Sequence, residues 1–106
     1  MSDPVLICYC TCPDAASAQK LADALVGDGL AACVNRLPGV SSTYRWQGKV
    51  VTESEVLLLI KTTESRFAAL KQRLLALHPY EVPELIAVPV AQGHAAYLDW
   101  VRASVG

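Results

Sequence analysis

The stretch VLICYCTC, Val5–Cys12, decides the fold predicted for this chain. It is almost continuously apolar, carries β-branched residues at intervals, and is followed by Pro13. A helix of this length is too short to stand alone, whereas a strand that is covered on both faces has a short, unbroken apolar run. We therefore expect Val5–Cys12 to form a strand in the centre of a sheet, buried on both faces.

A helix is predicted directly after this strand. Proline is tolerated in the first turn of a helix, and the carboxylate of Asp14 meets the positive end of the helix dipole. Apolar residues then recur at helical spacing, and glycines at 27 and 29 accept the left-handed geometry that ends a helix. The residues of this apolar stripe are Ala18, Leu21, Ala22, Leu25 and Val26.

Two further strands are expected as a long hairpin. Residues 30–34 begin the first of them, Pro38-Gly39 interrupts it as a bulge on an edge strand, and residues 40–46 alternate between two faces. Gln47-Gly48 forms the tight turn. Residues 49–62 return as a third strand, whose far half, VLLLI at 56–60, reads as buried on both faces.

The last third of the chain predicts helix, strand and helix. Thr62 or Thr63 is expected to cap the second helix, whose apolar stripe is Phe67, Leu70, Leu74 and Leu77. Residues 85–90 form the last strand, and Pro89 makes it an edge. After Gly93 a short helix, with His94 at its start, carries Tyr97, Leu98 and Val101 inward.

This order is β-α-β-β-α-β plus a terminal helix, the ferredoxin-like α+β pattern, in a single domain over residues 1–106. Right-handed crossovers place the first and third strands in the centre and the second and fourth at the edges. The prolines agree with this arrangement, because Pro38 and Pro89 fall on the two edges.

The predicted hairpin is longer than its own domain. Residues 30–46 could reach roughly 55 Å as a strand, while a globule of this length is roughly 35 Å across. The chain is also 53% hydrophobic and only 18% charged, against a usual charged fraction of about 25%. We therefore expect a homo-oligomer built by sheet extension, in which the hairpin pairs with a neighbouring chain.

Charge and cysteine usage exclude several classes of protein. The formal net charge is −1 and the nine Lys and Arg residues form no cluster, so no nucleic-acid or acidic membrane partner is predicted. The N-terminal residues lack a basic region, and the apolar run after them is too short for a signal peptide or a spanning helix. The four cysteines are expected to be reduced thiols in the cytoplasm.

The alternating thiols Cys8, Cys10 and Cys12 suggest either a metal site or small core residues. Successive members are about 6.7 Å apart along a strand, whereas two sulfurs on one zinc lie at most roughly 4.6 Å apart. Side chains could lean to join two of the thiols, but one strand cannot deliver all three. The core interpretation is favoured for the set, and a single thiol combined with ligands from elsewhere remains open.

The stretch HPYEVPE at 78–84 is the chemically densest part of the chain. His78 is a candidate metal ligand or acid-base group, or else an imidazole that satisfies the end of the second helix. Glu81 and Glu84 are more simply solvated or intersubunit residues, and Tyr44 and Trp46 suit ligand stacking or an interface. Neither a phosphate-binding glycine loop nor a nucleophile elbow is present, so no enzyme is predicted.

Several motifs together resemble the CutA divalent-cation tolerance family. They are LAACVN at 30–35, PGV at 38–40, YRWQGK at 44–49, KTT at 61–63, HPYEVPE at 78–84 and YLDW at 97–100. The resemblance implies a ferredoxin-like homotrimer, related in architecture to PII signalling proteins, with long hairpins exchanged between subunits. It also implies a role in the response to copper and other divalent cations, and no enzymatic activity.

The resemblance maps the copper ligands onto Cys10 and His78. This chain has Leu77 where a second histidine can precede, so one ligand is missing, and two ligands suit Cu(I) better than Zn(II) or Cu(II). Two functions are therefore expected as alternatives. One is a trimeric metal-response protein that presents Cys10, His78 and Cys33; the other is a PII-like regulatory or scaffold module that binds a small molecule or partner between subunits.

Overall fold

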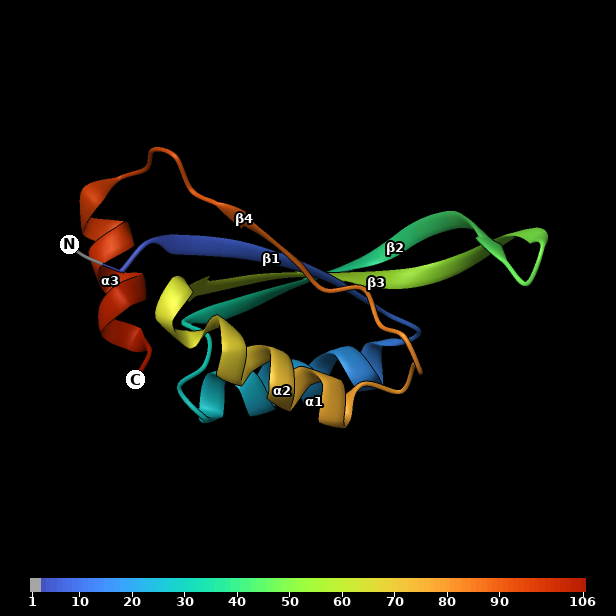
Figure 1. Cartoon of the computed structure of the whole chain (residues 1–106), viewed down its shortest axis with the longest axis horizontal. Coiled ribbons are helices and arrows are strands. Elements are labelled where there is room, and N and C mark those ends of the chain that lie inside the picture. Colours follow the sequence, from blue (N-terminus) through green and yellow to red (C-terminus); the bar gives the residue numbers. More distant parts are fainter. Residues whose placement is uncertain (1–2) are drawn as a thin grey trace.

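The computed structural model describes residues 3–106 and forms one layered α+β unit (Figure 1). Met1 and Ser2 lie outside the described residues, and the prediction that the N-terminus is not a signal peptide rests partly on them. In order, the elements are β1 (Val5–Cys12), α1 (Ala15–Gly27), β2 (Cys33–Trp46), β3 (Lys49–Thr63), a 3-10 turn η1 (Glu64–Arg66), α2 (Phe67–Leu77), β4 (Ile86–Pro89) and α3 (Ala95–Ser104).

The four strands form one antiparallel sheet in the order β2-β3-β1-β4. This confirms the ferredoxin-like α+β prediction, with the first and third strands in the centre. The helices α1 and α2 lie side by side against one face, and α3 packs at the end of the sheet where β1 begins (Figure 1).

The core lies between the sheet and the helices α1 and α2. Alternate residues of β1 and β3 point toward these helices, and the predicted helical stripes meet them. Its completely or almost completely buried members are Cys8, Cys10, Cys12, Ala18, Leu21, Leu25, Ala31, Leu58, Ile60, Leu70 and Leu74. The periodicity therefore predicted the covered faces of both helices correctly, except for Val26, which is 43% exposed near the end of α1.

The opposite face of the sheet, here called the open face, differs from the prediction. Ile7 and Tyr9 of β1 and Leu57 and Leu59 of β3 are only half-buried. In register with them lie three exposed side chains, Leu37, Ile86 and Val88. Within residues 3–106 neither α1 nor α2 covers this face, so the predicted burial on both faces is wrong for a single chain.

Two strand boundaries also differ from the prediction. The strand β2 begins at Cys33 rather than at residue 30, because the amides of Leu30 and Ala31 both donate to the carbonyl of Leu25, at 2.9 and 3.1 Å. These bonds complete the end of α1 before the chain can pair. The last strand is limited to Ile86–Pro89.

The hairpin of β2 and β3 extends beyond the helices (Figure 1). The molecule measures 46 × 26 × 22 Å, so its length exceeds either other dimension. The register shifts between Leu37 and Val40, as expected for a bulge at Pro38-Gly39. At the tip, Gln47 and Gly48 both have positive φ, 50° and 79°, which matches the twist of the two strands.

The helix α3 differs from the prediction in one residue. Val101 is completely buried and Leu98 is partly buried against the same small cluster as Val5. Tyr97 is 41% exposed and its ring lies 5.6 Å from that of Trp100, at an angle of 32°. Tyr97 reaches the sheet only with its hydroxyl, which lies 3.7 Å from the sulfur of Cys33, so it is not carried inward as predicted.

The start of the second helix is capped by a residue that is distant in sequence. Neither Thr63 nor Arg66 makes a side-chain cap bond, and Thr62 instead donates to the carbonyl of Leu30 at 2.6 Å. The carboxylate of Asp3 accepts from the backbone N–H of Ser65 at 2.9 Å and from its hydroxyl. The predicted threonine cap is therefore wrong, and Asp3 takes the role.

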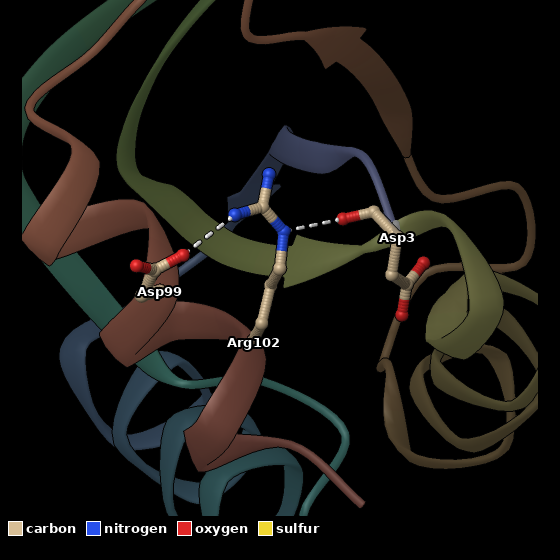
Figure 2. Close-up of polar contacts among 3 residues, drawn as sticks. All are labelled: Asp3, Asp99 and Arg102. Carbon is tan, nitrogen blue, oxygen red and sulfur yellow. Dashed lines mark hydrogen bonds and ion pairs between the residues drawn. The ribbon is translucent and has the colours of Figure 1, made fainter. Parts of the chain in front are cut away.

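The same segment is fixed to α3 by Arg102 (Figure 2). Its guanidinium donates to the backbone carbonyl of Asp3 at 2.8 Å and to the carboxylate of Asp99 at 3.1 Å. Asp3 therefore joins the start of β1, the turn before α2 and the last helix.

Replacing Asp3 by alanine should lower the free energy of unfolding at neutral pH. The stability of the variant should also fall less in acid than that of wild type. The hydrogen bonds from Ser65 lower the pKa of Asp3, so its contribution is complete above its unfolded pKa of about 3.9 and is lost as the pH falls through the folded value. Urea midpoints should therefore differ between wild type and Asp3→Ala at pH 7 and converge in acid. Asp99→Ala is the control, and an equal gap at every pH would contradict the capping role.

Candidate functional site

The imidazole of His78 connects the loop after α2 to the end of β1. His78 ends α2 through its backbone, whose N–H donates to the carbonyl of Leu74 at 2.9 Å. Its ring points away from the helix: Nε2 lies 2.8 Å from the carbonyl oxygen of Thr11, and Nδ1 lies 3.0 Å from the backbone nitrogen of Tyr80. The prediction that the imidazole satisfies the end of the helix is therefore wrong.

These two contacts fix the tautomer of His78. A backbone N–H can only donate, so Nδ1 must accept from Tyr80 and carries no proton. A carbonyl oxygen can only accept, so Nε2 must carry the proton that it donates to Thr11. The side chain is 7% exposed, and both of its nitrogens are satisfied.

Two thiols lie beside this ring. The Sγ atoms of Cys10 and Cys12 and a ring nitrogen of His78 are all within 4.8 Å of one another, and we call these three residues the thiol-imidazole cluster. The sulfur of Cys12 is 3.8 Å from Nε2. Both cysteines are completely buried. The cluster is the one group of three candidate metal ligands found within residues 3–106.

Sequence reasoning found two members of the cluster and missed the third. Cys10 and His78 were the predicted pair, and the structure brings them together. Cys12 joins them because residues two apart on a strand share a face. Cys8 shares that face but lies outside the cluster, in agreement with the argument that one strand cannot deliver three thiols.

The two thiols of the cluster share a hydrogen bond that moves their pKa values in opposite directions. Burial raises the pKa of Cys8, outside the cluster, to about 11. The bond between Cys10 and Cys12, and then burial, raise the pKa of Cys10 well above its usual range, and the same bond lowers the pKa of Cys12. Two thiolates therefore do not form together without a positive ion between them.

The other candidate residues lie elsewhere. Cys33 is half-buried with its sulfur 3.7 Å from the Tyr97 hydroxyl, so it does not join the cluster. His94 precedes α3, as predicted, and makes no side-chain cap bond. Glu81 and Glu84 are both exposed, in agreement with a solvated loop.

A cavity of about 510 Å³ lies between the hairpin and the loop at 78–84. We call it the hairpin cavity; its lining residues include Thr11, Tyr44, Trp46, Glu55, Tyr80 and Glu84. The Tyr80 hydroxyl donates to Glu55 at 2.6 Å, and the Tyr44 hydroxyl donates to Glu53. Burial, and then the bond to Glu55, raise the pKa of Tyr80, which keeps the phenol neutral. Glu55 had no local sequence signal, because Tyr80, its hydrogen-bond partner, lies 25 positions away in the chain.

Comparison with known proteins places this arrangement in a family. The CutA1 divalent ion tolerance protein family matches residues 6–104. The chain belongs to the CutA1 family. This confirms the resemblance inferred from the motifs, and the match covers every strand and helix except Val5, the first residue of β1.

Individual CutA proteins are similar over the whole chain. The divalent-cation tolerance protein CutA of Thermus thermophilus is 53% identical over 106 residues, 100% of both chains. The crystal structure of CutA from Xylella fastidiosa superposes with a TM-score of 0.95 at 48% identity, covering 97% of this chain and 99% of that one. Protein CutA 1, chloroplastic, of Oryza sativa subsp. japonica is 45% identical over 95% of this chain and 57% of its own length.

The helices of residues 3–106 are all too short or too polar to cross a lipid bilayer.

The hydrogen bonds of His78 predict one tautomer in solution. Nitrogen-15 NMR should show a protonated Nε2 and an unprotonated Nδ1 at neutral pH. His78→Phe keeps a ring in place but leaves the Thr11 carbonyl and the Tyr80 N–H without partners, so the free energy of unfolding should fall by about 2 to 4 kcal/mol. Replacing the exposed His94 by phenylalanine is the control. An Nδ1-protonated ring would contradict the assignment.

Proposed function

We propose that this CutA1 family member is a homotrimeric metal-response protein that binds Cu(I) in the thiol-imidazole cluster. The observation that carries the proposal is the convergence of Cys10, Cys12 and His78, whose ligand atoms lie within 4.8 Å of one another. Two sulfurs that share one metal ion at about 2.3 Å each lie at most roughly 4.6 Å apart. The thiols thus need little movement to hold one ion.

The chemistry of the donors favours Cu(I). Thiolates are soft ligands that select Cu(I), whereas a zinc site takes four ligands in a closed tetrahedron. Leu77 removes one imidazole that the family resemblance would supply, and Cys12 adds a thiol in its place. Three ligands, two of them sulfur, suit a Cu(I) ion of low coordination number.

Binding would require changes in the cluster that can be measured. Cys10 keeps its proton in the metal-free protein, because its pKa is raised, and it must release that proton to bind a metal ion. For Nε2 of His78 to become a ligand, its proton must move to Nδ1, so the ring gives up its bonds to both the Thr11 carbonyl and the Tyr80 N–H. The affinity should fall as the pH is lowered, because protons compete with the metal for the thiolates.

A Cu(I) titration with a competing chelator tests the site. Wild type should bind one ion per chain, and Cys10→Ser and Cys12→Ser should each weaken binding by more than about 100-fold, since a lost ligand costs at least as much as a lost supporting contact. His78→Ala should have a smaller effect, because its nitrogen must first give up a hydrogen bond.

Two matched controls accompany this titration. Cys8→Ser changes a buried thiol on the same face of β1, and Cys33→Ser changes a thiol on the open face. Both should bind as wild type does. A wild type without stoichiometric binding, or an equal loss in Cys8→Ser, would refute the proposed cluster.

The open face supports the proposed oligomer. It carries half-buried or exposed apolar side chains on all four strands, centred on Tyr9 and Leu59. Burying such apolar surface between chains stabilises an assembly by about 25 cal/mol per Å². The sequence of β1 and β3 reads as buried on both faces, and packing between subunits would complete that burial. The projecting hairpin offers its edge to a neighbour.

Light scattering on a size-exclusion peak tests the trimer. Wild type at micromolar concentration should contain three chains, and Tyr9→Asp or Leu59→Asp should give monomers, because each places a charge in the centre of the open face. Leu75→Asp, at a 47% exposed position on α2, should remain trimeric. Circular dichroism verifies folding of each variant, and a monomeric wild type would exclude the oligomer.

A second candidate function is a PII-like regulatory or scaffold module that binds a small molecule. The hairpin cavity favours it, because a volume of about 510 Å³ suits a small ligand.

We further propose a cytoplasmic location, because all four cysteines among the described residues are free thiols. We also propose that the protein has a role without catalysis.

A further inference from the structure

The hairpin cavity combines aromatic rings with carboxylates. Tyr44, Trp46 and Tyr80 supply three rings, and Glu55 and Glu84 supply two negative charges. The described residues that line it include no lysine, arginine or histidine. The cavity therefore has a negative lining and aromatic walls.

Glu55 is the most unusual of these residues. Its side chain is 8% exposed, and one oxygen accepts from the Tyr80 hydroxyl at 2.6 Å. Buried carboxylates are normally paired with a positive group. The ion pairs formed within residues 3–106 are Arg73 with Asp28 and Arg102 with Asp99, so Glu55 has no cationic partner in the described part of the chain.

Two of the rings are held in position before any ligand binds. The Tyr80 hydroxyl is fixed by Glu55, and its ring lies 4.8 Å from that of His78. The Tyr44 hydroxyl is fixed by Glu53. Rings held in this way lose little conformational freedom when a ligand binds, which favours affinity.

We propose that the hairpin cavity binds a small organic cation, an alkylated ammonium group on a compact body. Its charge would compensate Glu55, and its alkyl groups would pack on the faces of Tyr44, Trp46 and Tyr80, which attract cations through their π electrons. A volume of about 510 Å³ is sufficient for such a ligand.

The lining favours an organic cation over a bare metal ion. Magnesium and calcium need six or more oxygen ligands. Here one oxygen of Glu55 is already engaged by Tyr80, and the lining supplies only two carboxylates beside three aromatic rings. The inference rests on the second candidate function, since it names the ligand class of the same cavity, and it is independent of the copper proposal because it uses none of the thiols.

The test uses choline and its neutral carbon isostere, 3,3-dimethyl-1-butanol. The chain has two tryptophans, so Trp100→Phe leaves Trp46 as the fluorescent reporter. Choline should change the Trp46 emission saturably, with a dissociation constant on the order of 1 mM or lower, and the alcohol should not. Saturation-transfer NMR on the choline methyl protons provides a second measurement that does not depend on the emission.

Two Glu→Gln variants, one inside the cavity and one outside it, locate the site. Glu55→Gln keeps an acceptor for Tyr80 but removes the buried charge, and should weaken choline binding at least about tenfold. Glu81→Gln removes an exposed charge that does not line the cavity and should bind choline as wild type does.

Three results would overturn the proposal. The first is the absence of saturable choline binding in both measurements, which is expected if a neighbouring subunit fills the cavity. The others are equal binding of the neutral alcohol and full competition by magnesium chloride at the same concentration as choline. The copper proposal is separately testable, because Cys12→Ser should abolish copper binding and leave choline binding intact.

Discussion

The hydrogen bonds of one imidazole hold the functional half of this protein together. His78 donates to the carbonyl of Thr11, 67 positions before it, and accepts from the N–H of Tyr80, so a single side chain satisfies two backbone groups from distant segments. A buried polar group without a partner costs about 1 to 3 kcal/mol. The loop after α2 carries Pro79 and Pro83, which donate no backbone hydrogen bonds, so this side chain fixes the loop on β1.

That interaction also joins the thiol-imidazole cluster to the hairpin cavity. Thr11 lies between Cys10 and Cys12 in sequence, and its own side chain lines the cavity on the opposite face of β1. Tyr80 bonds to His78 through its backbone and to Glu55 through its hydroxyl. His78 therefore contacts a backbone group beside each site, although the two sites share no ligand-binding side chain.

The two faces of the sheet serve different purposes. Even-numbered residues of β1 pack under α1 and α2, and odd-numbered residues form the open face. The unbroken apolar sequence of β1 follows from this division, since an alternating strand would leave one face polar. The single chain leaves the apolar open face and the hairpin partly exposed, which is the arrangement that association between chains would relieve.

The sequence by itself determined the element order, the central strands, the edge strands and the covered helix faces, because periodicity and the missing donor of proline are local properties. Tertiary structure decided the rest. The cap of the second helix came from Asp3, and the strand β2 began later because Leu30 and Ala31 bond to α1. Cys10 and His78 were predicted as a pair through family resemblance, but the addition of Cys12, the tautomer of His78 and the burial of Glu55 depend on contacts between distant segments. No local pattern encodes such contacts, since they exist only once the helices have packed on the sheet.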